Sequence, residues 1–444
     1  MAYPFGSSTG MAFDELVKKL QSAIETFLDK RTGKNTLFSL TDAALAAFSV
    51  FFTQSPSFLA YQKTMQETKG KNNAQTLFGI TVIPSDVHIR NLLDETQPSY
   101  VSPVFMYAFN KLKDSGQLNE FRSLNDNLLI ALDGVQYFSS QKIHCENCST
   151  KNHANGTVTY SHTAITPAIV TPRRNTAIPL IPEFITPQDG HDKQDCETAA
   201  AKRWLTQHAS TFKNYAITIL GDDLYCHQPI CDLILKEMLN FIFTCKPDSH
   251  KTLYQWVDDL ASMGTVTTIT KKTRHKNTFI TETYRFVNHV PLRDGDAALM
   301  VNWCELVTTK KDGTVIYKNA FATNHEITQN NVDQIVAAGR ARWKIENENN
   351  NTLKTKGYNL EHNFGHGKKN LSSLLATLNI LAFLFHTVLD MTDEKYWLIR
   401  KKLPTRKTFF EDIRALTRYM CFDCWNDLLI FMMKGLEMDV PNSS

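Results

Sequence analysis

Three acidic residues, far apart in the chain, occur where metal-dependent phosphodiester chemistry would need them. Asp133 follows the apolar run LLIAL, Asp222 follows ITILG, and Glu346 lies on a polar stretch with helical spacing. A sheet-based fold can gather acids from two strand ends and one helix around two divalent cations. Two such ions, Mg²⁺ or Mn²⁺, held about 4 Å apart can activate an attacking oxygen and stabilise a leaving one. The sequence therefore predicts a two-metal site at Asp133, Asp222 and Glu346.

The two aspartates also have other interpretations. Asp133 is followed by Gly134, and Asp-Gly pairs are common in ordinary turns. Asp222 is followed by Asp223, and both lie at the tip of the same predicted strand. Side chains alternate across a strand, so only one of the two can face the metals. Asp222 is favoured, with Asp223 as the alternative.

The glutamate shares a predicted helix face with an arginine. Arg342 precedes Glu346 by four residues, which places both side chains on one side of a helix. The arginine would keep the carboxylate ionised and could hold a phosphate. Glu348 and Glu361 are alternatives for the third acid. The simpler interpretation of the pair is a surface ion pair, which contributes little to stability.

Cysteine and histidine pairs could form a structural zinc site, which needs four ligands. HCENC supplies two thiols in CxxC spacing and HNFGHG supplies two imidazoles, so the candidate set is Cys145, Cys148, His362 and His366. Free thiols and loop histidines are the favoured interpretation, because neither half of the set predicts its partner. A second CxxC pair, in CFDC, lies in an aromatic segment typical of core thiols.

Hydrophobic periodicity divides the chain into five parts. Residues 1–125 are predicted to be helical, 126–250 to alternate strands and helices, 251–330 to form an antiparallel β insertion, 331–390 to return to helix, and 391–444 to be helical. The predicted fold class is therefore α/β with α+β character: a mixed sheet flanked by helices, interrupted by the insertion. The helices of the first part could be a DNA-binding module or a bundle that packs on the core.

Composition and charge exclude few functions. The 444 residues include 42% hydrophobic and 21% charged residues, and the formal net charge is only +3. Two basic clusters, KKTRHK (271–276) and IRKKLPTRK (399–407), could contact phosphates or be solvated loops. The apolar stretch 374–389 is too short and too polar to span a bilayer and is predicted to be a buried helix.

The beginning of the chain and its cysteines bear on location. MAYPFGSSTGMAFDE has no apolar core of the kind a signal peptide requires. The nine cysteines are odd in number and unevenly spaced, which indicates reduced thiols. We therefore expect a soluble intracellular protein with no membrane partner.

The strings LDGVQYFSS, GDDLY and GRARWKIENE resemble the DDE transposases of bacterial insertion sequences. The resemblance covers roughly residues 30–390. It is to the branch whose third acid lies in a Tyr-x2-Arg-x3-Glu-x6-Lys signature and whose RNase H-like core is split by a β-rich insertion. In that family the first acid follows the first strand, the second follows the fourth, and the third lies on a helix after the insertion. Asp133, Asp222 and Glu346 fit those places.

Two signature positions differ from the family pattern. Gly339 stands where the tyrosine belongs, and Leu353 stands where the lysine belongs, with Lys354 one residue later. Arg342 and Glu346 keep their spacing. Because the acids are intact, the resemblance implies an active enzyme.

The resemblance also implies a reaction and partners. Two Mg²⁺ (or Mn²⁺) ions at the three acids would promote nicking of double-stranded DNA at the element ends, and the freed 3′-OH would then attack target DNA. Arg342, Lys354 and Lys356 would contact phosphates. The protein would be at least dimeric on DNA and cytoplasmic, associated with the bacterial nucleoid. A nuclease that lacks strand transfer, and a catalytically silent DNA-binding protein, are the alternatives.

Overall fold

The computed structural model describes residues 13–441 apart from 33–36, 188–194, 213–214 and 276–277. A nine-stranded mixed sheet forms its centre, in the order β10-β11-β12-β13-β9-β8-β1-β5-β6. The strands of its central part are β1 (Leu128–Ala131), β5 (Ala168–Val170), β6 (Ile178–Pro179), β8 (Ile217–Gly221) and β9 (Asn240–Thr244). β1, β8 and β9 are parallel neighbours, whereas β5 and β6 are antiparallel.

Three chain segments bend and continue into a second, smaller sheet. Its strands are β2 (Gly134–Ser140), β3 (Ser149–Asn152), β4 (Val158–Ile165) and β7 (Glu183–Ile185). β1 continues into β2, β4 into β5, and β6 into β7. Pro167 and Pro182 lie at two of the bends, where a residue without a backbone donor cannot continue a ladder. Asp133 lies at the third, between β1 and β2.

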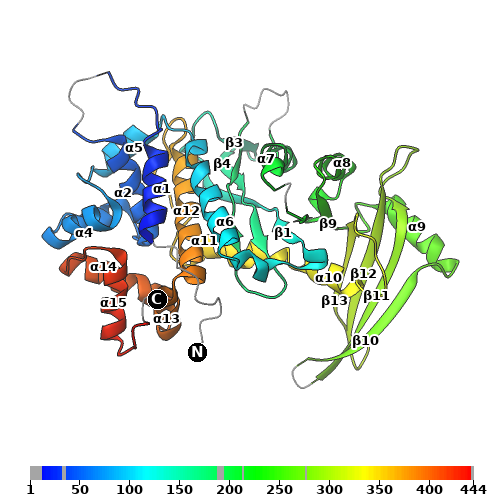
Figure 1. The fold of residues 1–444 in the computed structure, drawn as a ribbon. Coiled ribbons are helices and arrows are strands. Elements are labelled where there is room, and N and C mark those ends of the chain that lie inside the picture. Colours follow the sequence, from blue (N-terminus) through cyan, green and yellow to red (C-terminus); the bar gives the residue numbers. More distant parts are fainter. Residues whose placement is uncertain (1–12, 33–36, 188–194, 213–214, 276–277, 442–444) are drawn as a thin grey trace.

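The expected β insertion extends the large sheet. It comprises α9 (Lys251–Ser262), β10 (Thr267–His275), β11 (Thr278–Pro291), β12 (Met300–Lys310) and β13 (Val315–Thr323). β13 pairs with core strand β9, so the four antiparallel strands prolong the core sheet to one side (Figure 1). The helix α9 was not expected in this range. It buries Leu253 and Val257, one helical turn apart, and packs on β11.

Alternate residues of the central strands enter two separate cores. Ile130, Ile219 and Phe243 belong to one apolar cluster, whereas Leu129 and Leu220 belong to the other. Strand side chains alternate between faces, so this division is the expected result for strands buried on both sides. Helices α7 (Glu197–Phe212) and α8 (Gln228–Lys236) contribute to the first cluster, and α10 (Val332–Arg340) to the second.

Helices from the two ends of the chain pack together beside the core (Figure 1). They are α1 (Phe13–Ile24), α2 (Leu40–Phe52), α3 (Phe58–Met65), α4 (Thr68–Phe78), α5 (Asp86–Leu93), α6 (Ser102–Asp114), α12 (Leu371–Thr392), α13 (Glu394–Lys402), α14 (Arg406–Tyr419) and α15 (Trp425–Gly435). Asn73 on α4 donates its amide to the carbonyls of Thr417 and Met420, both at 2.6 Å. The helices before the central sheet therefore pack against the helices that follow it in sequence.

Short helical segments complete the described chain. They are η1 (Pro98–Val101), η2 (Gln117–Phe121), η3 (Leu124–Asp126), η4 (Asp223–Tyr225), the π-helical η5 (Ile345–Asn350) and α11 (Asn351–Thr355).

The apolar helix α12 runs through the middle of the helical region. It alone among the described helices is long and apolar enough to cross a membrane by length and composition, and 94% of its most apolar window is buried inside the molecule. It packs on α2, α6 and α13. The prediction of a buried helix in this stretch is confirmed, as is the mixed α/β fold class with a split sheet and helical ends.

Candidate active site

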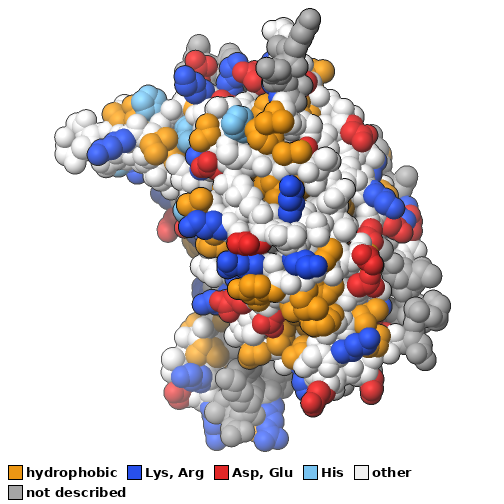
Figure 2. Space-filling view, turned by 90° about the vertical axis from the view of Figure 1, so that its left-hand side faces the viewer, with side chains coloured by type: hydrophobic (Ala, Val, Ile, Leu, Met, Phe, Trp, Pro, Cys, Tyr) orange, Lys and Arg blue, Asp and Glu red, His pale blue; other side chains and the backbone are white. Residues whose placement is uncertain are grey.

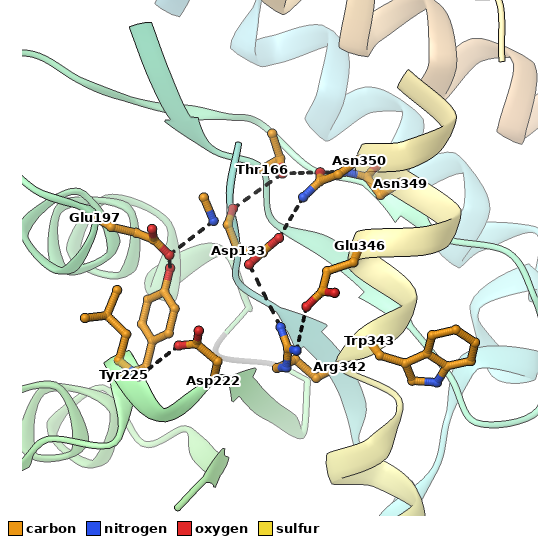
Figure 3. Close-up of polar contacts among 12 residues, drawn as sticks. Asp133, Thr166, Glu197, Asp222, Tyr225, Arg342, Trp343, Glu346, Asn349 and Asn350 are labelled. Carbon is orange, nitrogen blue, oxygen red and sulfur yellow. Dashed lines mark hydrogen bonds and ion pairs between the residues drawn. The ribbon is translucent and has the colours of Figure 1, made fainter. Parts of the chain in front are cut away.

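Two of the three acids lie at the carboxyl ends of adjacent parallel strands. Ala131 of β1 lies opposite Leu220 of β8, and the Leu132 amide donates to the Leu220 carbonyl at 2.9 Å. Asp133 and Asp222 each come two residues after these partners. Their carboxylates therefore emerge side by side at one edge of the sheet (Figure 3). Such an edge is the usual location of ligand sites in α/β proteins.

Glu346 approaches this edge from the helix that follows α10. Arg342 links the acids: its Nη2 donates to Glu346 Oε1 at 2.6 Å, and its Nη1 lies 3.9 Å from Asp133 Oδ1 (Figure 3). The fold therefore brings Asp133, Asp222 and Glu346 together, although 213 residues separate the first from the last (346 − 133). Arg342 compensates part of the negative charge that these carboxylates concentrate.

The segment that carries Glu346 is a single stretch of π-helix, η5. Such segments are rare and are frequent at functional sites, because the wider turn re-aims side chains. Ile345 is buried in the second core cluster. Lys344 donates its ammonium to the carbonyls of Pro172 (3.2 Å) and Arg174, and to Asn175 Oδ1 at 3.3 Å. These contacts fix the position of the helix relative to the sheet.

An asparagine at the end of η5 orients Asp133. Asn350 Nδ2 donates to Asp133 Oδ2 at 2.8 Å. Its Oδ1 accepts from Thr166 Oγ1 at 2.7 Å and from Asn349 Nδ2 at 2.9 Å (Figure 3). Asn350 is not among the site residues predicted from the sequence. The only signal is its place in the Asn-rich run ENENNN, one helical turn after Glu346.

A fourth acid, Glu197, lies behind the site and was also missed. Its Oε1 accepts from the Gly134 amide at 3.2 Å and from the Tyr225 hydroxyl at 2.6 Å. A Cβ at position 134 would collide with this carboxylate, which explains the glycine after Asp133. Glu197 starts α7, a position where acidic residues are ordinary, so local sequence offered no reason to choose it.

The neighbouring aspartates at the tip of β8 have different surroundings. Asp223 accepts hydrogen bonds from the Lys246 amide at 2.7 Å and from Ser249 Oγ at 2.5 Å, and it lies 3.4 Å from His250 Nε2. Asp222 caps η4 by accepting from the Leu224 amide at 2.9 Å, and it lies on the side of Asp133 (Figure 3). The geometry therefore favours Asp222 over Asp223 as the second acid.

The pKa of Asp133 is raised to about 7. Burial of the carboxyl group is the largest cause, and the negative charge of Glu346 is the next. Arg342 opposes the increase, whereas Glu197 and Asp222 add to it. A carboxylate so surrounded by other negative charges is stabilised by a proton or by a cation.

The remaining acids and lysines of the sequence prediction lie elsewhere. Glu361 forms an ion pair with Lys354 at 2.7 Å. Burial raises the pKa of Glu348, and the positive charge of Lys344 opposes this increase. Leu353, at the signature lysine position, is fully buried, and Lys356 lies exposed just after α11. Neither Lys354 nor Lys356 contributes to the contacts that join the three acids.

The tyrosine position of the signature is occupied by glycine for a steric reason. A Cβ at Gly339 would lie 2.6 Å from the Phe321 ring and 3.1 Å from Ile242 Cγ2. Strands β13 and β9 therefore approach α10 too closely for any side chain there.

Three of the four candidate zinc ligands come together, and His162 takes the place of His362 beside them. His162 of β4 lies beside Cys145, Cys148 and His366. His362 instead packs edge-on against Phe364, with the two ring centroids 4.7 Å apart. His162 was missed, although it follows Cys148 by 14 residues (162 − 148), a Cys-x2-Cys-x13-His spacing that is a usable signal for zinc ligands.

The two basic clusters differ in exposure. Lys272 and Arg274 are exposed on β10, the edge strand of the large sheet. In the second cluster Arg406 donates to the Tyr358 hydroxyl at 2.8 Å, and Arg400 packs on the Phe409 ring. Part of the second cluster is therefore structural. On the face of the helical region that Figure 2 shows, basic and acidic side chains are interspersed.

Comparisons with known proteins add little. No family model matches the chain, and no curated protein matches it. Among solved structures, a cryo-EM structure of the piggyBac transposase synaptic complex with hairpin DNA is similar at 11% identity and a TM-score of 0.41. That match covers 98% of this chain and 81% of the other. A TM-score below 0.5 supports no conclusion about this chain.

Proposed function

We propose that this protein is a DDE-type DNA transposase that cleaves and joins phosphodiesters with two divalent cations held by Asp133, Asp222 and Glu346. The observation that supports the proposal is the convergence of these acids, from two adjacent strand ends and a π-helical segment, with Arg342 between two of them. Three carboxylates at an open sheet edge are the donor set of a two-metal phosphoryl-transfer site.

The donor set fits Mg²⁺ or Mn²⁺. Carboxylate and amide oxygens are the ligands that these hard cations prefer, and no thiol or imidazole takes part in the contacts described at this edge. When bound, the ions would polarise the attacking oxygen and neutralise charge on the leaving oxygen. The raised pKa of Asp133 means that this carboxyl group must release a proton before it can act as a ligand.

The protein groups around the acids would position the ligands and the DNA. Asn350 and Thr166 fix the orientation of Asp133, and Glu197 holds the backbone at Gly134. Arg342 is the cation placed to contact a phosphate once metals neutralise the carboxylates. Trp343, beside it, is 51% exposed and offers a ring face to an unstacked base.

The finer features of the proposal follow from the sequence resemblance. The substrate would be double-stranded DNA at the ends of an insertion sequence, and the second step would join the freed 3′-OH to target DNA. Pairing of two DNA ends implies a dimer or larger assembly on DNA. Such a protein would act in the bacterial cytoplasm at the nucleoid.

The decisive experiment is cleavage of a supercoiled plasmid that carries the DNA flanking the gene, with Mg²⁺, Mn²⁺ or EDTA. We expect nicking with either cation and none in EDTA. Asp133→Asn should abolish nicking while the thermal unfolding midpoint stays constant or rises, because a buried carboxylate has been replaced by a neutral amide. Asp126→Asn, at an exposed position at the end of η3, is the matched control and should cut normally.

The products distinguish the alternatives. Joining of a 3′-OH oligonucleotide to the plasmid supports transposition, whereas cleavage without joining indicates a nuclease. DNA binding without cation-dependent nicking indicates a silent DNA-binding protein. Normal cleavage by Asp133→Asn would refute the assignment of the three acids.

A further inference from the structure

Four metal-ligating side chains from three separate segments meet away from the acid site. Cys145 and Cys148 lie in the turn between β2 and β3, His162 lies on β4, and His366 lies in the loop before α12. Their ligand atoms all lie within 4.8 Å of one another. Cys148, His162 and His366 are 3%, 5% and 7% exposed, so the cluster is buried.

The distances are those of a tetrahedron around a small cation. Zn–S bonds of about 2.3 Å and Zn–N bonds of about 2.0–2.1 Å give tetrahedral edges of about 3.8 Å for S···S, about 3.6 Å for S···N and about 3.3 Å for N···N. The Cys145 and Cys148 sulfurs are 3.9 Å apart. Three of the four S···N distances, Cys145–His162, Cys148–His162 and Cys148–His366, are 3.4–3.5 Å, and the two Nε2 atoms are 3.2 Å apart. The fourth, Cys145–His366, lies within 4.8 Å.

The ring of His366 is oriented for metal binding. Its Nδ1 lies 3.0 Å from the carbonyl of Gly367, so this nitrogen must carry the proton and Nε2 presents a lone pair to the other three groups. The Cys145 amide also donates to Cys148 Sγ at 3.4 Å. Two sulfurs and two imidazole nitrogens converge here, and a cation at their centre would accept a lone pair from each.

We propose that Cys145, Cys148, His162 and His366 bind one structural Zn²⁺. Two thiolates and two imidazoles in tetrahedral arrangement are a zinc donor set, and four protein ligands leave no open position for catalysis. A disulfide between the two cysteines does not fit, because the sulfurs are 3.9 Å apart and a disulfide bond measures about 2.05 Å.

The ion would join the two parts of the chain that carry the acids. β2, which leads into the cysteine turn, begins at Gly134, the residue after Asp133. His366 follows Glu346 by 20 residues (366 − 346). A zinc cross-link here would hold the second sheet against the loop that leads into α12, and so stabilise the arrangement on which the acid site depends.

A second group of potential ligands is less complete. Cys226, Cys245 and His250 also lie within 4.8 Å of one another, but this group supplies three donors. His250 Nε2 also lies 3.4 Å from Asp223 Oδ1. We assign no metal to it.

The test is the zinc content of the purified full-length protein, measured by plasma mass spectrometry together with thermal unfolding. We expect one zinc per chain and a lower unfolding midpoint after chelation, restored by Zn²⁺. Cys148→Ser and His162→Ala should lose the zinc. The matched controls, His362→Ala and the double variant Cys421→Ser/Cys424→Ser, should keep it, because these residues lie outside the cluster.

A second measurement does not require that the variants fold. Zinc K-edge absorption of the wild-type protein should show two sulfur ligands at about 2.3 Å and two nitrogen ligands at about 2.0–2.1 Å. Zinc-free protein with an unchanged unfolding midpoint, or zinc that survives His162→Ala but not His362→Ala, would overturn the proposal. Neither readout depends on DNA cleavage, so the zinc site and the proposed function can fail separately.

Discussion

Asp133 is the residue on which most of the site chemistry depends. It lies at the bend between two sheets, with Glu346 and Asp222 near it and Glu197 behind it. Burial among negative charges raises its pKa to about 7, and Arg342 offsets only part of this effect. The fold therefore holds a carboxyl group in surroundings that disfavour its charge, which is common at functional sites. A bound cation would remove this penalty.

Removal of the amide that orients Asp133 should weaken cation binding. Asn350→Ala loses the 2.8 Å hydrogen bond to Asp133 Oδ2 and the 2.7 Å hydrogen bond from Thr166, whose hydroxyl keeps only its 3.5 Å contact with the Asp133 carbonyl. Loss of such a supporting contact typically costs about 10- to 100-fold in metal affinity or activity. Mn²⁺ titration calorimetry measures the affinity.

Asn347→Ala is the matched control for this prediction. Asn347 lies on the same helical segment, but its side chain contacts the Trp343 carbonyl and not an acid. Equal loss of Mn²⁺ affinity in the two variants would show that Asn350 has no special role.

At the scale of elements, the far end of the central strands is joined by buried polar contacts. Thr218 of β8 contacts His325 Nε2 at 2.9 Å and donates to Asn127 Oδ1 at 3.2 Å. Asn302 of β12 donates to the His325 carbonyl at 2.8 Å. These contacts tie the strands of the insertion to β8, so the extended sheet behaves as one element.

His325 should make the stability of this element pH-dependent. Burial lowers its pKa to about 4, below the ordinary value of about 6.5 that applies when the chain is unfolded. Between these two values the unfolded state binds more protons, so the stability associated with neutral His325 is complete above pH 6.5 and is lost as the pH falls toward 4. The loss attributable to this residue is up to about 3 kcal/mol.

Urea unfolding of the wild type and of His325→Gln between pH 4 and 7 tests this prediction. The glutamine can still contact Thr218 but does not titrate. The free energy of unfolding should therefore fall less steeply below pH 6.5 in the variant than in the wild type. Parallel curves would contradict the assignment to His325.

At the scale of the whole molecule, the location of the charged side chains is more informative than the net charge. The net charge is only +3, and the visible face of the helical region carries both signs (Figure 2). The exposed Lys272 and Arg274 lie instead on the edge strand β10, at the opposite side of the molecule from α4 and α14 (Figure 1). Cations on an edge strand also discourage pairing with another sheet.

Replacement of Lys272 and Arg274 on β10 should lower the affinity for DNA and make that affinity less dependent on salt concentration. If each contacts one phosphate, Lys272→Ala/Arg274→Ala should reduce the slope of log K against log salt concentration by about 2. Fluorescence anisotropy at several salt concentrations measures this slope. Lys69→Ala/Lys71→Ala, on the exposed side of α4, should leave the slope unchanged. An equal reduction in both double variants would contradict a role for β10.

The sequence predicted some parts of this arrangement and missed others for physical reasons. Asp133 and Asp222 follow apolar strands, and an acid at such a position needs a partner, so local sequence was enough to select them. Asn350 and Glu197 act through contacts with residues 28 to 217 positions away. No spacing rule covers such distances. The bends at Asp133 and Pro167 were missed because each half-strand remains apolar.

The long helix α12 has a consequence for how the protein is made. α2 and α6 pack on it, yet a ribosome adds 319 residues from the end of α2 at Phe52 up to and including Leu371 (371 − 52). At the usual 5–20 residues per second this interval lasts about 16 to 64 seconds. During that time α2 and α6 lack the partner α12, although they can already pack on α5 and α1. The emerging chain is therefore a natural client for chaperones, and the helical region can close only after α12 has been made.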